Sequence, residues 1–456
     1  MGTVGLSFGA ATSGQGFDVA STVTQILASE QSIETPGKNQ LTSLQAQDTA
    51  FTSIGTDLST LTTSLQALTD FTGVMSQKDG SSSNTNILTL TGATSAASAG
   101  SHTITVSNLA TTSSDYSGTV TNAADELSGT ITIQVGSGQT STVTVDSSSN
   151  TLGTLASAIN SANLGVTASV ITDASGSRLS LVSGTSGSAG QLTISSDLTD
   201  ATTGASVGFS VGQTGKNASL TVDGIALSTA SNTVNNAIPG VTFQLLASDV
   251  GTSVQVQITN DDSSVISAMS SFVSAYNAVV KDITTQEGKD SSGNAEPLYG
   301  NPTLALIQSQ LSQALLGGSA SGSISNIGQL GISMNNDGTL TLESGALQSA
   351  LDSNYSDVTG FLQNSGSFGQ NFATVLNNLG TQAPNGEIYL ALQQNAATEK
   401  ALNTSITNED ARIAADKISL TNTLNTANDE LQAIPSQLNE VDELYSAITG
   451  YNSKSS

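Results

Sequence analysis

The chain has 456 residues, which suits about three domains of ~150 residues each, and its net charge of −26 comes from 36 acidic and 10 basic residues. The Lys and Arg residues are scattered singly, which excludes nucleic acid and anionic membranes as partners, because both need clustered positive charge. The absence of cysteine excludes disulfides and thiolate metal sites, and no apolar run approaches the roughly 18 residues of a membrane span. We therefore expect no metal, no cofactor and no membrane insertion.

The N-terminal part of the sequence predicts two helices. Residues 1–17 are rich in Gly, Ser and Thr, and Asp18 is placed to cap a helix that should end near Glu34, before Pro36-Gly37. A second helix is expected from about Leu41 to Phe71, with a heptad seam of Leu44, Phe51, Ile54, Leu58, Leu61, Leu65 and Leu68. The pattern leaves open whether this seam faces the chain's own core or a helix of another molecule.

From about Ser76 the hydrophobic period changes from that of a helix to that of a strand. Thr130–Val135 and Thr142–Asp146 predict a hairpin, and Thr151–Ala162 predicts a short helix. Further strands are expected at Val166–Ile171, Arg178–Val182, Gln191–Ile194, Ser219–Val222, Val241–Leu246 and Ser253–Thr259. This middle region is therefore predicted to be mostly antiparallel β structure.

Helices resume near Asp262 and Pro302, and the last one is expected from Ile388 to about Ile448. Its seam is the longest heptad pattern of the chain: Ile406, Ile413, Leu420, Leu424, Leu431, Ile434, Leu438, Val441, Tyr445 and Ile448. The pattern favours a coiled coil over a face buried in the chain's own core. Asp410 and Lys417 occupy seam positions and would restrict its register, and Pro435 predicts a kink or break near Leu431–Ile434.

These elements predict an α+β multidomain fold in which terminal helical coiled-coil legs enclose an inserted, mostly antiparallel β head. The expected domains fall into four parts: terminal leg segments, flexible or coiled coil (1–40 and 396–456), a helical leg domain (41–75 and 261–395), a first β head domain (76–110 and 214–260) and a second one (111–213).

The sequence offers little for catalysis. His102, the single histidine, stands at the start of a strand without a convincing nucleophile. Gly204–Gly208 matches a nucleophile elbow but leads into strand, and Gly136-Ser137-Gly138 lacks the third glycine of a dinucleotide site. Asn335–Gly338 resembles a calcium loop but has Ala346 where the acidic twelfth ligand belongs, so a hairpin turn is expected. We expect no enzyme.

With these elements placed, the chain resembles the flagellar filament cap proteins, also called the hook-associated protein 2 family. The segment from Thr221 to Phe243 is similar to the family's most recognisable core segment, with Asp223, Gly224, Pro239 and Gly240 as motif residues. Gly14–Val19 looks like the family's N-terminal opening, Leu304–Leu315 and Leu330–Leu340 like its helical domain, and Thr130–Ile194 like the β motif of hook and filament proteins. The break at Thr35-Pro36-Gly37 is spaced differently from the family's, and Pro435 and Tyr451-Asn452 match its ending only loosely.

The resemblance implies an extracellular protein at the tip of the bacterial flagellum, exported without a cleaved signal peptide. It implies three kinds of partner: copies of the chain in a ring of five or six, flagellin at the filament tip, and a dedicated export chaperone with the flagellar type III export apparatus. The ring would promote the folding and insertion of flagellin subunits and prevent their loss. Rival interpretations are another flagellar axial protein (a junction or filament subunit), a surface adhesin and, last, a hydrolase.

Overall fold

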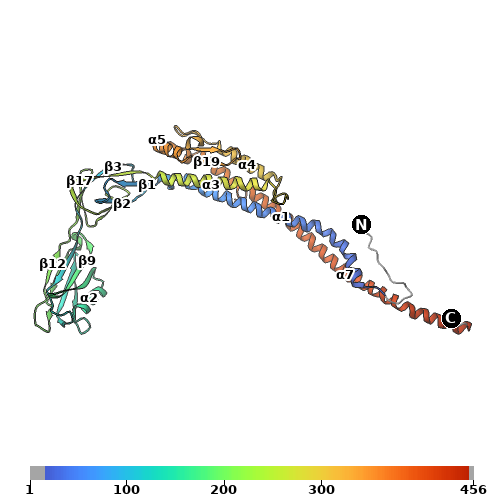
Figure 1. Ribbon diagram of the computed structural model, residues 1–456, viewed down its shortest axis with the longest axis horizontal. Coiled ribbons are helices and arrows are strands. Elements are labelled where there is room, and N and C mark those ends of the chain that lie inside the picture. Colours follow the sequence, from blue (N-terminus) through green and yellow to red (C-terminus); the bar gives the residue numbers. More distant parts are fainter. Residues whose placement is uncertain (1–15, 451–456) are drawn as a thin grey trace. The chain divides into compact units, whose positions relative to one another are not determined.

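The computed structural model describes residues 16–450, and the chain divides into two compact units (Figure 1). A helical unit contains the chain up to Thr69 and from Ser267 onward, and a β unit contains Asp70–Ile266. The predicted fold class, terminal helices that flank an inserted and mostly antiparallel β region, is confirmed.

Helix α1 (Val19–Thr69) begins where the sequence predicts, with the Oδ1 atom of Asp18 accepting the Ser21 N–H at 3.1 Å. Its predicted end before Pro36-Gly37 is wrong, because the helix runs through both residues. Proline removes one hydrogen bond of the helix, but here Glu34 is buried and Gly37 faces Ile406 of helix α7 (Glu387–Thr449). Packing between the two helices therefore overrides the local signal. Helix α7 likewise continues through Pro435, so the predicted break does not occur there.

The helical unit is completed by α3 (Asp262–Gln286), α4 (Pro302–Leu315), α5 (Ser344–Gln363), α6 (Phe368–Leu379) and the hairpin of β18 (Ile332–Met334) and β19 (Leu340–Leu342). That hairpin confirms the turn expected at Asn335–Gly338. Helix α3 is long and apolar enough to cross a membrane by length and composition alone. Its side chains Phe272, Tyr276 and Ile283 are buried in this unit, as in the core helix of a folded domain.

The β unit contains two separate hydrophobic cores. The first core is formed by two sheets. The larger sheet has the strand order β1 (Lys78–Ser82), β17 (Asp249–Asn260), β3 (Gly100–Asn108), β13 (Ala218–Val222), β14 (Ile225–Thr229). The smaller sheet has the order β15 (Thr233–Asn235), β16 (Val241–Leu245), β2 (Leu88–Ala93). The strand pairs in both sheets are antiparallel.

The second core lies under α2 (Leu152–Ser161), whose N-cap Thr151 forms a capping box with Thr154. Its largest sheet is ordered β12 (Phe209–Gln213), β4 (Thr112–Ser117), β9 (Gly176–Ser186), β8 (Val166–Asp173). Two smaller sheets are ordered β10 (Leu192–Ser196), β6 (Thr130–Val135), β7 (Ser141–Thr144) and β11 (Thr199–Asp200), β5 (Leu127–Ser128). The predicted hairpin and short helix of this region are thus confirmed.

Strand β4 carries a buried carboxyl group, Asp115, whose Oδ1 atom has no hydrogen-bond partner among residues 16–450. Burial raises the pKa of Asp115. A carboxyl group whose pKa is higher in the folded state than in the unfolded state contributes most to the stability of the fold below its unfolded pKa of about 3.9. That contribution is lost as the pH rises through the folded-state pKa. We expect Asp115→Asn to raise the free energy of unfolding by about 1 kcal/mol at pH 7 and by less at pH 4. Urea unfolding at the two pH values measures the difference, and an equal effect at both would contradict it.

Candidate functional site

The N-terminal half of α1 and the stretch of α7 from Asn395 to Asn428 form an antiparallel helix pair within one chain (Figure 1). The Phe17 N–H donates to the Asn428 Oδ1 atom at 2.8 Å, and the Asn395 Nδ2 atom donates to the Asp48 Oδ1 atom at 2.7 Å. Between these points a small apolar cluster of Val23, Leu27 and Ile413 is extended by Val19, Leu420 and Leu424. The C-terminal seam therefore finds part of its partner inside its own chain.

The two predicted seams differ in how far they are covered. In the N-terminal seam, Leu44 is half-buried and the others are buried in the helical unit: Phe51, Ile54, Leu58, Leu61, Leu65 and Leu68. In the C-terminal seam, Ile413 is buried. Five further seam residues are half-buried: Ile406, Leu420, Leu424, Leu431 and Ile434. Its last members are exposed, with Leu438 at 47%, Val441 at 61%, Tyr445 at 57% and Ile448 at 76%. That this exposed end assembles with other molecules stays a prediction.

A layer of charged residues interrupts the apolar contact between α1 and α7. Lys38 binds the buried Glu34 at 2.5 Å and reaches Asp410 of α7 at 3.6 Å, and the Glu34 carboxylate raises the pKa of Lys38. Arg412 binds Glu409, lies 3.2 Å from Asp416 and lies 4.0 Å from Glu30 of α1. Asp410 and Lys417 are both exposed on α7, so their predicted place in the packed seam, where they would restrict its register, is wrong. The partners Glu34 and Lys38 were missed, although their four-residue spacing is the signal of a helical ion pair.

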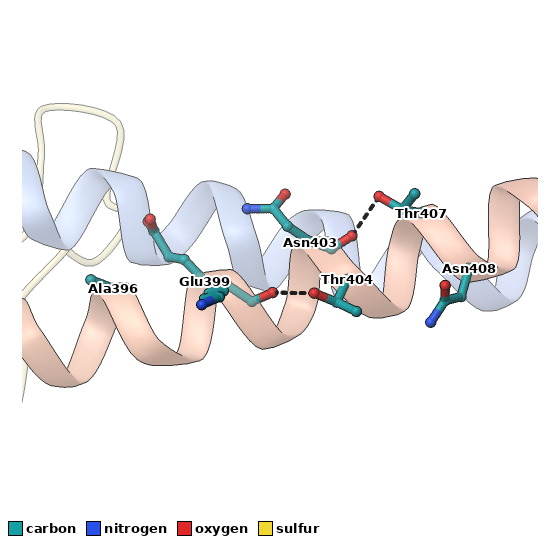
Figure 2. Close-up of a pocket in the computed structure, with 7 residues that line it drawn as sticks. Ala396, Glu399, Asn403, Thr404, Thr407 and Asn408 are labelled. Carbon is teal, nitrogen blue, oxygen red and sulfur yellow. Dashed lines mark hydrogen bonds between the residues drawn. The ribbon is translucent and has the colours of Figure 1, made fainter.

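One face of α7 carries an open groove lined mostly by residues of polar type, which Figure 2 shows. Its lining comes from this one helix, from Ala396 to Asn408. The Thr404 hydroxyl donates to the Lys400 carbonyl at 2.9 Å and the Thr407 hydroxyl to the Asn403 carbonyl at 2.8 Å, so both are satisfied within the helix. Within residues 16–450, no three or more His, Asp or Glu side chains gather so as to hold a metal ion.

The predicted motif residues Asp223 and Gly224 form the tight turn between β13 and β14, with φ values of +51° and +82°. One Asp223 carboxylate oxygen accepts the Thr103 N–H at 2.8 Å, and the other lies 2.7 Å from the His102 Nδ1 atom. His102 thus lies in β3, as expected, beside this turn. The bond to His102 and that to Thr103 lower the pKa of Asp223.

We expect the Asp223 carboxylate to stabilise the β unit at neutral pH. A carboxyl with a lowered folded pKa contributes stability above its unfolded pKa of about 3.9, and this is lost as pH falls through the folded value. Asp223→Asn retains a residue that tolerates positive φ and should lower the unfolding midpoint by more at pH 7 than at pH 2.5. Thermal unfolding at both values checks this; equal losses would mean that the turn, and not the charge, matters.

The other motif pair, Pro239-Gly240, precedes strand β16. Gly240 has a φ of +73°, and its carbonyl accepts the Thr94 N–H at 2.8 Å. A Cβ atom at Gly240 would lie 2.7 Å from the Ala97 nitrogen, so only glycine fits this close approach of two backbones. The structure thus gives the motif a role in folding, while any direct role in assembly stays a prediction. Gly14 and Gln15 of the N-terminal opening, with Tyr451 and Asn452 of the ending, lie outside the described residues.

Comparisons with known proteins support the family resemblance. Residues 215–448 match the family model described as flagellar hook-associated protein 2 C-terminus, residues 15–113 match the model for its N-terminus, and residues 130–185 match the flagellin hook IN motif. The chain is 31% identical over 354 residues to the B-type flagellar hook-associated protein 2 of Pseudomonas aeruginosa, covering 71% of this chain and 74% of that one. It is 29% identical over 374 residues to the protein of that name from Escherichia coli, covering 76% and 78%.

A solved structure shares the fold. The crystal structure of the D1-D2-D3 domains of the flagellar cap protein FliD from Escherichia coli superposes with a TM-score of 0.58 at 27% identity, covering 76% of this chain and 99% of that one. More than half of the chain fits the model of the family's C-terminal part alone. The chain therefore belongs to the flagellar hook-associated protein 2 family.

Proposed function

We propose that this chain caps the distal end of the bacterial flagellar filament. The family and the shared fold with a flagellar cap protein support this role. The observation that carries it is the α1–α7 pair, since the pair covers the first half of the C-terminal seam and leaves Leu438–Ile448 exposed to engage something outside the chain.

The proposal also covers the binding partners of the chain and its location. Copies of the chain form a ring of five or six at the tip, flagellin is inserted beneath it, and a dedicated chaperone delivers the chain to the flagellar type III export apparatus. It leaves the cell without a cleaved signal peptide and acts as a structural factor, not as an enzyme. The four-part domain division is part of this proposal: the two separate cores of the β unit support two head domains.

Deletion of the gene in the source bacterium tests the role. We expect bare hooks in electron micrographs and unpolymerised flagellin in the medium, with both reversed by the wild-type gene. Filaments of normal length in the deletion strain would contradict a capping role, and a missing segment between hook and filament would mean a junction protein instead.

A further inference from the structure

A small groove lies between α1 and α7 next to the charged layer. It has a volume of about 200 Å³ and is lined mainly by apolar atoms of residues from both helices: Ile33, Glu34, Gly37, Leu402, Ile406 and Glu409. The Glu34 side chain is 4% exposed, and its Oε2 atom binds Lys38. Its Oε1 atom is buried and has no hydrogen-bond partner among residues 16–450. A buried carboxylate oxygen without a donor is costly, so the groove is suited to a side chain with an apolar stem and a donor at its tip.

The charges around the groove favour a positive tip. Two cations, Lys38 and Arg412, are in reach of five carboxylates, those of Glu30, Glu34, Glu409, Asp410 and Asp416. The layer thus keeps three negative charges in excess (five minus two). An ammonium group on a four-carbon stem meets both requirements, because its methylenes can lie along apolar side chains while its N–H groups donate.

The same stretch of α7 displays such a group on another side of the helix. Lys400 is exposed, lines the open groove of Figure 2 and makes no ion pair within the described part of the chain. At 100° and 1.5 Å per residue, Lys400 points about 160° away from Leu402 around the helix, yet lies only about 3 Å from it along the axis. The Lys400 ammonium group, which donates, and the groove with the Glu34 carboxylate, which accepts, thus lie at about the same height along the α1–α7 pair but on different faces of it.

We propose that Lys400 of one copy enters the Glu34 groove of the next copy, so that the legs stand side by side. Two different faces that fit one another make a heterologous contact, and such contacts close into rings when the rotation allows it. The inference rests on the proposed function, since it names the surface through which copies of the chain would pack in the cap.

Single-cysteine variants test the contact directly, because the chain has no cysteine of its own. Ser405 lines the groove and Asn403 lines the Lys400 face. Full-length Ser405→Cys and Asn403→Cys proteins are treated with a short bis-maleimide, at high concentration in solution and on flagellated cells. We expect cross-linked dimers when the two variants are mixed and none with either alone. Dimers from one variant alone, no product in either setting, or cross-links to flagellin instead would overturn the proposal.

Charge-reversal variants provide a second test of the contact. Lys400→Glu should raise the concentration needed for half-assembly about tenfold, whereas Lys417→Glu, the same change farther along α7 at another exposed lysine, should leave it unchanged. Equal effects of the two would mean that only net charge matters and would overturn the contact. Cells that cap normally with Lys400→Glu and show no cross-link refute the inference but leave the capping role intact. A chain that cross-links in solution but is absent from filament tips refutes the capping role alone.

Discussion

Replacing Leu438, Tyr445 and Ile448 with Ser should abolish capping and leave the fold of the chain unchanged. The three side chains lie on one face of α7 and are between 47% and 76% exposed, so their loss removes little buried surface from the free protein. We expect the free energy of unfolding to change by less than about 0.5 kcal/mol. In cells that carry only this variant, flagellin should accumulate in the medium as monomer, as in the deletion strain.

A matched control separates the apolar face from the helix that carries it. Glu440→Ser, Glu443→Ser and Ala447→Ser change three exposed residues on the opposite side of the same stretch and should leave filaments normal. Leu424 is unsuited to this test, because it packs against the Val23–Leu27–Ile413 cluster and its replacement would also loosen the α1–α7 pair. Normal filaments with the Leu438, Tyr445 and Ile448 variant would show that the exposed end of the seam is dispensable.

Phe372→Ala should cause the largest loss of stability in the helical unit. Its ring is fully buried on α6, meets Phe272 edge-on with centroids 5.5 Å apart, and lies 5.6 Å from the Phe368 centroid. Truncation of a buried phenylalanine costs about 3–5 kcal/mol, because it removes apolar contact and leaves a cavity among neighbours that relax only partly. Urea unfolding followed by the helical circular dichroism signal measures the loss.

Asn377→Ala is the control for this change, since Asn377 is exposed one turn along the same helix. Its effect should stay within about 0.5 kcal/mol. A Phe372→Ala protein that unfolds at the wild-type urea concentration would contradict the assignment of this cluster as the core of the unit.

The sequence predicts regular elements well where pattern and packing agree. The heptads of α1, the hairpin of β6 and β7 and the short helix α2 combine local propensity with an apolar face that has somewhere to pack. Pro36 shows where local reasoning fails. A proline signal is read from neighbours in sequence, but the helix is held by Ile406 and Asp410 of α7, more than 360 residues away.

The sequence predicts the candidate site only in part, for the same reason. The periodicity of the C-terminal seam finds its residues, yet cannot say that Ile413 and Leu424 pack against the chain's own N-terminal helix while Leu438 and Ile448 stay exposed. That outcome depends on where α1 begins. Similarly, burial of Glu34 depends on a partner helix that no local pattern reveals.

Labelling the protein on intact flagella tests the proposed role most directly. Ala174 lies exposed in the turn between β8 and β9, and an Ala174→Cys variant carries the only cysteine of the chain. Coupled to a fluorescent maleimide on cells whose filaments are marked in a second colour, it should give one spot at the distal end of each filament. Label along the whole filament, or at its junction with the hook, would contradict a cap and would mean another axial subunit.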